Sequence, residues 1–201
     1  MIRILLAEDQ AMVRGALAAL LRLESDMEVV AEVARGDEVL PAAIKTKPDV
    51  ALLDIEMPGG SGLAAAQALH VQLPACRVVI VTTFGRSGYL RQAMESGAVG
   101  FLLKDAPAAE LAKALRRVVA GERVVDPALA LTALSEGENP LTPRERETLA
   151  ASLDGASVAE IAARLVISEG TTRNHISTAM QKLGAHNRTE AARLAEAKGW
   201  L

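Results

Sequence analysis

Residues 50–54 read Val-Ala-Leu-Leu-Asp, and the chain continues Ile-Glu-Met-Pro-Gly to residue 59. Four consecutive apolar side chains are typical of a strand that is buried on both faces of a parallel sheet. The run ends on the acid Asp54, and the Pro-Gly pair that follows signals a turn. In open parallel sheets, ligands bind outside the carboxyl ends of the strands. This stretch therefore predicts an α/β fold with Asp54 at a ligand site.

Similar apolar runs lie on either side of this one in the first 120 residues, and a segment long enough for a helix separates each run from the next. Strands that alternate with helices in this way indicate a doubly wound α/β domain. We therefore expect a five-stranded parallel sheet within residues 1–120. The expected strands are 2–7, 29–33, 50–54, 78–82 and 99–103.

Beyond residue 120 the strand pattern stops. Residues 121–140 contain glycine, proline, aspartate and asparagine, so we expect a linker there. Residues 141–201 carry helix-start signals instead, three of them capping boxes with a glutamate three residues after the cap. The expected N-caps are Thr142, Ser157, Ser168 and Asn187. The chain should therefore end in a small all-α domain of four helices.

The composition excludes several classes of protein. No apolar run approaches the roughly 18 residues needed to span a bilayer, so we expect a cytoplasmic protein without membrane insertion. Cys76 is the only cysteine, which excludes an intramolecular disulfide, and the spacing of the histidines does not suit zinc. Residues 141–201 carry 8 basic and 7 acidic groups, so any DNA binding must depend on local arrangement rather than on overall charge.

Polar residues fall at the carboxyl ends of four of the expected strands. Glu8 and Asp9 follow the first, Asp54 ends the third, Thr82 ends the fourth and Lys104 follows the fifth. Three neighbouring carboxylates repel one another, so a divalent cation is expected, and oxygen ligands suit Mg²⁺. With Mg²⁺ and Lys104 to neutralise an incoming phosphoryl group, Asp54 becomes a candidate nucleophile. The alternative is that these groups are ordinary loop caps and a solvated ion pair.

The segment 157–183 has the pattern of a helix-turn-helix. In its second helix an inner stripe that includes Thr172 is expected to be buried, and the Thr172 hydroxyl then needs a partner. The opposite side is polar and free of acids, with Glu169 to one side. We expect Arg173 and Asn174 to read base edges in the major groove. Contacts to phosphate or sugar are expected from Ser177, Lys182 and Arg188, although a merely solvated helix face is the alternative.

Several segments resemble known families. Glu8-Asp9, residues 54–59, residues 81–83 and residues 100–104 resemble the bacterial receiver domain. Residues 141–147, 159–162, 167–171 and 182–191 resemble the LuxR/FixJ-type DNA-binding domain. The whole chain is similar to response regulators of the NarL/FixJ family, in particular its DesR-like group.

The resemblance implies a flavodoxin-like receiver in which a sensor histidine kinase phosphorylates Asp54. It also implies Mg²⁺ held by Asp9, Asp54 and the Glu56 carbonyl, with Glu8 acting through water. Thr82 and Phe101 would form the switch pair. The phosphorylated protein would bind double-stranded DNA as a homodimer.

The expected helix over residues 12–23 is apolar over a wide arc. One stripe suffices for packing on the sheet, and a second, smaller patch beside it suits a partner subunit. The packing stripe is Val13, Leu17, Leu20 and Leu21, and the second patch is Met12, Ala16, Ala19 and Leu23. Glu56 and Phe84 are expected to flank the path of water to a phosphorylated Asp54.

Two other functions compete with this interpretation. The chain could be a phosphatase or phosphotransferase that uses Asp54 catalytically, with Glu56 as its acid and base. It could also be a DNA-binding regulator that phosphorylation does not affect. Multiple turnover of a phosphoester would identify the enzyme.

Overall fold

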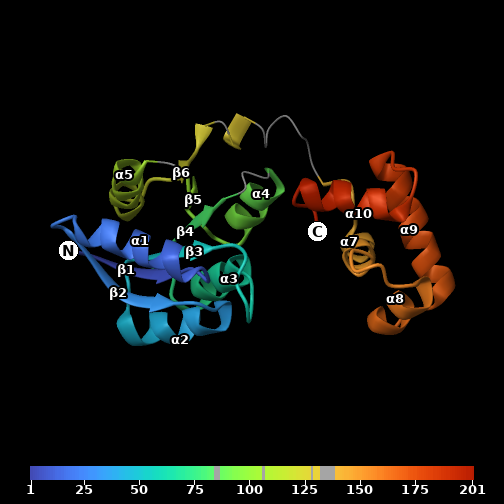
Figure 1. The fold of residues 1–201 in the computed structure, drawn as a ribbon, viewed down its shortest axis with the longest axis horizontal. Helices are drawn as coiled ribbons and strands as arrows, with labels where there is room; N and C mark the ends of the chain where they lie inside the picture. Colours follow the sequence, from blue (N-terminus) through green and yellow to red (C-terminus); the bar gives the residue numbers. More distant parts are fainter. Residues whose placement is uncertain (84–86, 106, 128, 132–138) are drawn as a thin grey trace. The chain divides into compact units, whose positions relative to one another are not determined.

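The computed structural model describes residues 1–83, 87–105, 107–127, 129–131 and 139–201. They form two compact units, of which the first lies within residues 1–131 and the second consists of residues 139–201 together with residues 87–89 at the start of α4. The first 131 residues contain the sheet and its helices (Figure 1). In order they are β1 Ile2–Ala7, α1 Ala11–Arg22, β2 Met27–Val33, α2 Gly36–Thr46, β3 Val50–Asp54, α3 Gly62–Gln72, β4 Arg77–Thr82, α4 Ser87–Glu95, β5 Gly100–Leu103, α5 Ala108–Val119 and β6 Val124–Val125.

The sheet is parallel throughout, with the strand order β2-β1-β3-β4-β5-β6. The expected doubly wound fold is confirmed, but the expected count of five strands is wrong. The sixth strand lies in the stretch expected to be linker and pairs Gly100 with Val124 and Phe101 with Val125. Two residues are too few to produce a strand pattern in a sequence, so only their pairing with β5 reveals β6.

Helices cover both faces of this sheet. In Figure 1, α1 and α5 lie on one face, and α2 and α3 lie on the other. Every residue of β3 is buried, as expected for a central strand between two helical layers. Between the sheet and the α1 and α5 layer, Ile4, Leu52, Val79 and Leu115 belong to one apolar cluster. This central position of β3 fixes Asp54 at the middle of the sheet's carboxyl edge.

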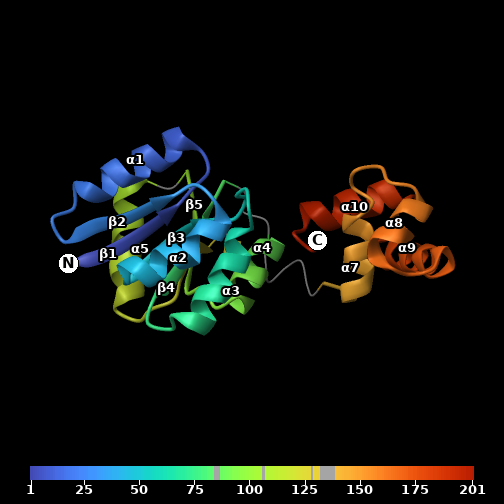
Figure 2. The same ribbon diagram turned by 90° about the horizontal axis from the view of Figure 1, so that it is seen from below.

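The second unit is helical. Its elements are α7 Pro143–Ala150, α8 Val158–Leu165, α9 Glu169–Leu183 and α10 Arg188–Ala197 (Figure 2). The four expected N-caps are all present, with complete capping boxes at Thr142 and Ser157. The box expected at Asn187 is displaced, because the Glu190 carboxylate accepts the amide of His186 at 2.7 Å instead.

Helices α8 and α9 form the expected helix-turn-helix around a cluster of Ala156, Ile161 and Ile176. Thr172 is fully buried, and its hydroxyl donates to the Ser168 carbonyl at 3.1 Å. The structure thus supplies the partner that this hydroxyl needs. Val166 ends α8 in the left-handed conformation, with φ 54°, and its side chain is exposed.

Cys76 is buried and free, and burial raises the pKa of its thiol to about 11. The thiol is therefore kept protonated and unreactive.

Among the described residues, no helix combines the length and the apolar character needed to cross a membrane.

Candidate functional site

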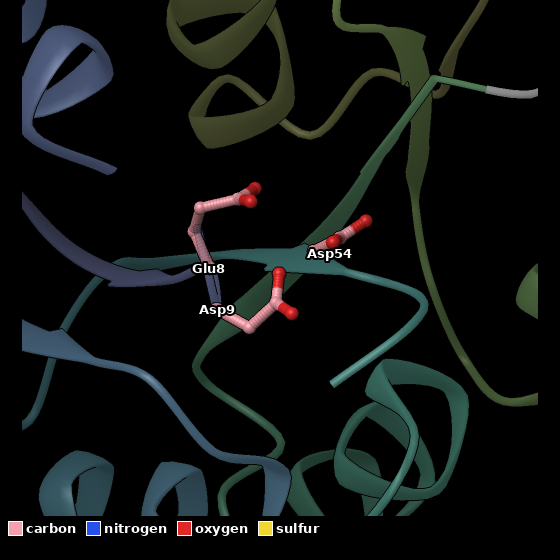
Figure 3. A group of neighbouring side chains, drawn as sticks. All are labelled: Glu8, Asp9 and Asp54. Carbon is pink, nitrogen blue, oxygen red and sulfur yellow. The ribbon is translucent and has the colours of Figure 1, made fainter. Parts of the chain in front are cut away.

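Glu8, Asp9 and Asp54 bring their carboxylates together at the carboxyl edge of the sheet. One oxygen of each lies within 4.8 Å of the others, and Figure 3 shows how they project from the ends of β1 and β3. The two strands are neighbours whose register pairs Ala7 with Leu53, so the residues that follow must be adjacent. The predicted convergence of these acids is confirmed.

Lys104 lies between two of these acids. Its Nζ is 2.6 Å from Glu8 Oε2 and 3.0 Å from Asp54 Oδ2. The Lys104 side chain is only 8% exposed, and both acids are buried, so the attraction between the charges is stronger than at the surface. Its backbone amide donates to the Thr82 carbonyl at 2.8 Å, which places the lysine beside the end of β4.

The burial of this cluster changes its ionisation. Burial raises the pKa values of Glu8 and Asp54 above the ordinary values, although the ammonium of Lys104 opposes this. Burial alone would lower the pKa of Lys104, but its hydrogen bonds and charge pairing with Glu8 and Asp54 outweigh burial and raise it. Lys104 therefore stays charged, and this one ammonium contacts two of the three clustered carboxyl groups. The three carboxylates are compatible with a divalent cation, and these hard oxygen donors suit Mg²⁺.

A pocket of about 130 Å³ opens beside Asp54. Its lining is polar and consists of Asp9, Gln10, Asp54, Glu56, Thr82, Thr83 and Lys104. The Ile55 amide donates to Asp54 Oδ1 at 2.8 Å, which fixes one carboxylate oxygen while Oδ2 faces Lys104. Gln10 and Thr83 were missed by sequence reasoning, although each directly follows a residue that was predicted.

The proposed switch residues lie at different depths. Thr82 is buried and lines the pocket, whereas Phe101 is fully buried in β5, opposite Ile80 of β4, and is not part of the lining. Phe84, which was expected to obstruct water, lies outside the described residues. Of the predicted receiver residues that the structure describes, five line one pocket, namely Asp9, Asp54, Glu56, Thr82 and Lys104. Glu8 lies behind them and contacts Lys104.

Helix α9 exposes Arg173, Asn174 and Ser177 on the side opposite its buried stripe. This is the polar face expected from the sequence. Glu169, however, is not merely to one side, because its Oε2 is 2.6 Å from the Arg173 guanidinium. To bind a base, Arg173 must first leave Glu169, which costs free energy. The ion pair therefore affects the contribution of Arg173 to DNA binding.

Lys182 was expected to contact DNA, but its ammonium lies 2.8 and 3.0 Å from the two carboxylate oxygens of Glu145. Glu145 is buried and also accepts the Thr142 amide at 2.7 Å, so it joins the cap of α7 to α9. Burial favours a higher pKa for Glu145, but the hydrogen bonds from Lys182 and Thr142 outweigh it and lower the pKa. Lys182 therefore has a structural role in this unit. Arg188, the first residue of α10, is half-buried.

Comparisons with known proteins agree with both units. The family "Response regulator receiver domain" matches residues 4–116, and the family "Bacterial regulatory proteins, luxR family" matches residues 139–195. Two Bacillus subtilis (strain 168) proteins match over the full length of both chains, the uncharacterized transcriptional regulatory protein YvfU at 48% identity and the transcriptional regulatory protein DesR at 47%. The crystal structure of the response regulator ChrA from a heme-sensing two-component system matches with a TM-score of 0.60 and 34% identity, covering 100% of this chain and 98% of that one.

Proposed function

This chain belongs to the response regulators that join a receiver domain to a LuxR-family DNA-binding domain, and we propose that phosphorylation of Asp54 controls its binding to DNA. The observation that carries this proposal is the position of Asp54, which shares one pocket with Asp9, Thr82 and Lys104. We assign the receiver to residues 1–120, with β6 as an addition to its sheet, and the DNA-binding domain to residues 141–201. Residues 121–140 connect them.

The phosphoryl donor is a phosphohistidine of a sensor histidine kinase. An Asp54 carboxylate oxygen attacks the phosphorus, and the phosphorus–nitrogen bond breaks with its electron pair passing to the imidazole. Lys104 stabilises one phosphoryl oxygen, and the Thr82 hydroxyl donates to another. Asp9, Asp54 and the Glu56 carbonyl would hold Mg²⁺, with Glu8 acting through water. When bound, Mg²⁺ supplies positive charge that offsets the repulsion between the acids and the phosphoryl group.

A small phosphodonor, such as acetyl phosphate, tests this assignment directly. Wild-type protein should be labelled in a Mg²⁺-dependent reaction, and Asp54→Asn should not be labelled. Asp49→Asn is the matched control, because Asp49 precedes the same strand at its opposite end. Equal labelling of Asp54→Asn would overturn the assignment, and multiple turnover of a phosphoester would favour the enzyme instead.

The buried switch pair links the pocket to the rest of the receiver. When Thr82 moves toward the phosphoryl oxygen, the packing around the buried Phe101 ring changes. Because Phe101 has no hydroxyl, its contribution is packing alone. A small change in packing is sufficient to shift the equilibrium between the inactive and the active receiver if it favours the active state by a few kcal/mol.

For DNA binding we propose that α9 enters the major groove. Arg173 and Asn174 then reach base edges, while Ser177 and Arg188 contact phosphate or sugar. Lys182 is paired with Glu145, which offsets part of its positive charge, so its contribution to affinity is small. Because the proposed target is DNA and the proposed donor is a sensor kinase, we propose that the protein acts in the cytoplasm.

We propose that the phosphorylated protein dimerises through α1. Met12 of α1 is 87% exposed, and Leu23, the C-cap of α1, is 80% exposed, so both large apolar side chains are accessible to a partner. Leu20, which was expected to pack on the sheet, is instead exposed, and Ala18 is buried in its place, so the prediction for Leu20 was wrong. Ala16, Ala19 and Leu20 thus extend the patch. A two-fold dimer suits two adjacent DNA half-sites.

Sedimentation with and without phosphodonor tests the dimer. Met12→Glu and Leu23→Glu should each prevent the increase in mass, because a charge would be buried without a partner. Val71→Glu is the control, since Val71 is an exposed apolar residue on α3. Dimerisation that survives both α1 substitutions would place the interface elsewhere.

A further inference from the structure

Gly36, the first residue of α2, lies against the loop 55–61 that follows Asp54. A β-carbon on Gly36 would overlap the carbonyl oxygen of Gly60 and lie 2.5 Å from its carbonyl carbon. The backbone amide of Gly36 also donates to the Pro58 carbonyl at 3.0 Å. Because both partners are main-chain atoms, only a residue without a side chain permits this approach.

The same turn of α2 touches the loop at a further point. Gly59 has φ +77°, and a β-carbon there would lie 2.5 Å from Arg35 Nη2 and 2.6 Å from Asp37 Oδ1. Arg35 and Asp37 hold each other in place through two hydrogen bonds of 2.9 and 2.8 Å. The start of α2 therefore contacts three consecutive loop residues, Pro58, Gly59 and Gly60.

The loop leads directly back to the phosphoacceptor. Its first residue, Ile55, donates its amide to Asp54 Oδ1 at 2.8 Å. At its far end the Gly62 amide donates to the Ile55 carbonyl at 2.9 Å, and a β-carbon on Gly62 would overlap the Asp54 carbonyl oxygen. Both ends of the loop are thus held against Asp54. When its middle moves, the main chain between Ile55 and Pro58, which includes Glu56, must move with it.

We propose that Gly36 is a positioning residue for the phosphoacceptor site. It is not part of the pocket lining, but it holds the loop that sets the Asp54 carboxylate and the Glu56 carbonyl. This inference rests on the proposed function, because it takes the Glu56 carbonyl to be a Mg²⁺ ligand. Mg²⁺ needs near-ideal octahedral geometry, so its affinity reports small displacements of that carbonyl.

The substitution Gly36→Ala forces a main-chain movement. The atoms that its β-carbon meets belong to the backbone of Gly60, so no rotation of a side chain relieves the overlap. The loop must retreat by roughly an ångström, and misplacement on that scale lowers reaction rates by as much as about 100-fold. We expect Mg²⁺ affinity to fall by at least about ten-fold, together with the rate of labelling by a phosphodonor.

Calorimetric titration of the full chain with Mg²⁺ provides a readout that does not depend on phosphorylation. Val39→Ala is the stability control, because Val39 is fully buried on the same helix and its truncation weakens packing without adding an atom near the loop. Gly15→Ala is the control for the change of residue type, because a β-carbon there meets nothing within 4 Å. Both controls should bind Mg²⁺ as the wild type does.

The possible outcomes separate the two claims. Wild-type protein that binds no Mg²⁺ overturns both this inference and the proposed site. Wild-type binding with equal affinity in Gly36→Ala overturns the inference alone, as does an equal loss in Val39→Ala. If Gly36→Ala does not fold, Asp37→Ala replaces it, because it removes the side chain that lies against Gly59. A loss of a few-fold is then expected, and unchanged affinity overturns the inference.

Discussion

The acidic pocket and the exposed face of α9 hold their charged groups in different ways. In the pocket, Lys104 is buried between Glu8 and Asp54, which come from distant parts of the chain. On α9, Arg173 is exposed and paired with Glu169, one helical turn away in the same helix. Removing a buried partner leaves a charge without solvent, whereas removing an exposed one leaves a charge in water. The comparison teaches that substitutions in the pocket should affect both folding and chemistry, whereas substitutions of Arg173 and Glu169 on the exposed face of α9 should affect binding alone.

The largest effect is expected from Lys104→Met. Without Mg²⁺, this variant leaves Glu8 and Asp54 buried without their cation, which should lower the free energy of unfolding by about 3–5 kcal/mol. Urea unfolding measures this loss of stability, and a chelator in the buffer removes Mg²⁺. Lys113→Met is the control, since Lys113 pairs with Glu110 on the exposed side of α5 at 3.8 Å and should change stability little. Equal effects of the two substitutions would remove the distinction between buried and exposed charge.

Arg173→Ala should weaken binding to a specific DNA site by about 1–3 kcal/mol and relax the preference for one base. Glu169→Gln should act in the opposite direction, because it releases the guanidinium and removes a negative charge near the DNA. Fluorescence anisotropy with specific and unrelated duplexes measures both, while urea unfolding should detect little change. A uniform loss on all sequences in Arg173→Ala would make this arginine a phosphate contact.

The ion pair between Lys182 and Glu145 lies between these two extremes, because Glu145 is buried but Lys182 is about one-third exposed. Lys182→Met should destabilise the helical unit by about 1–2 kcal/mol, since hydrogen bonds to a charged group are lost. A loss of DNA affinity without any loss of stability would instead favour the original expectation of a phosphate contact.

The pH dependence of this pair follows from the lowered pKa of Glu145. Its contribution to stability is fully present above the ordinary glutamate value of 4.5 and is lost as pH falls through the lower value of the folded state. The stability difference between the wild type and Glu145→Gln should therefore shrink below about pH 4.5. A difference that grew on acidification would contradict the direction of the shift.

The smallest effect is expected at Val166, a β-branched residue in the left-handed conformation between α8 and α9. This conformation costs a non-glycine residue about 1–2 kcal/mol, and asparagine tolerates it better. Val166 is 89% exposed, so little packing is lost on substitution. Val166→Asn should stabilise the helical unit by about 1 kcal/mol, as thermal unfolding would show. Destabilisation would mean that the exposed valine makes a contact in this unit that outweighs its strain.

The sequence predicted the acidic pocket well because topology alone brings the ends of parallel strands together. Asp54, Thr82 and Lys104 needed only the strand boundaries and the rule that ligands bind at the carboxyl edge. It predicted the exposed face of α9 for a similar reason, since helical periodicity separates Arg173 from the buried stripe.

Other features depend on contacts that periodicity does not encode. The pairing of Lys182 with Glu145 joins residues of two helices whose packing has no signature in either segment. The two-residue strand β6 is too short for a pattern, and Leu20 is exposed because Ala18 occupies the buried position on α1. The role of Gly36 is similarly hidden, because it depends on the approach of Gly60 from another loop.

The central claim is that the state of Asp54 controls DNA binding. Sites are first selected from random-sequence DNA, and their affinity is then measured with and without phosphodonor at one fixed salt concentration. The account predicts that phosphodonor tightens binding by the wild type and has no effect on Asp54→Asn. Equal affinity of the wild type in both conditions, or a response that persists in Asp54→Asn, would contradict it.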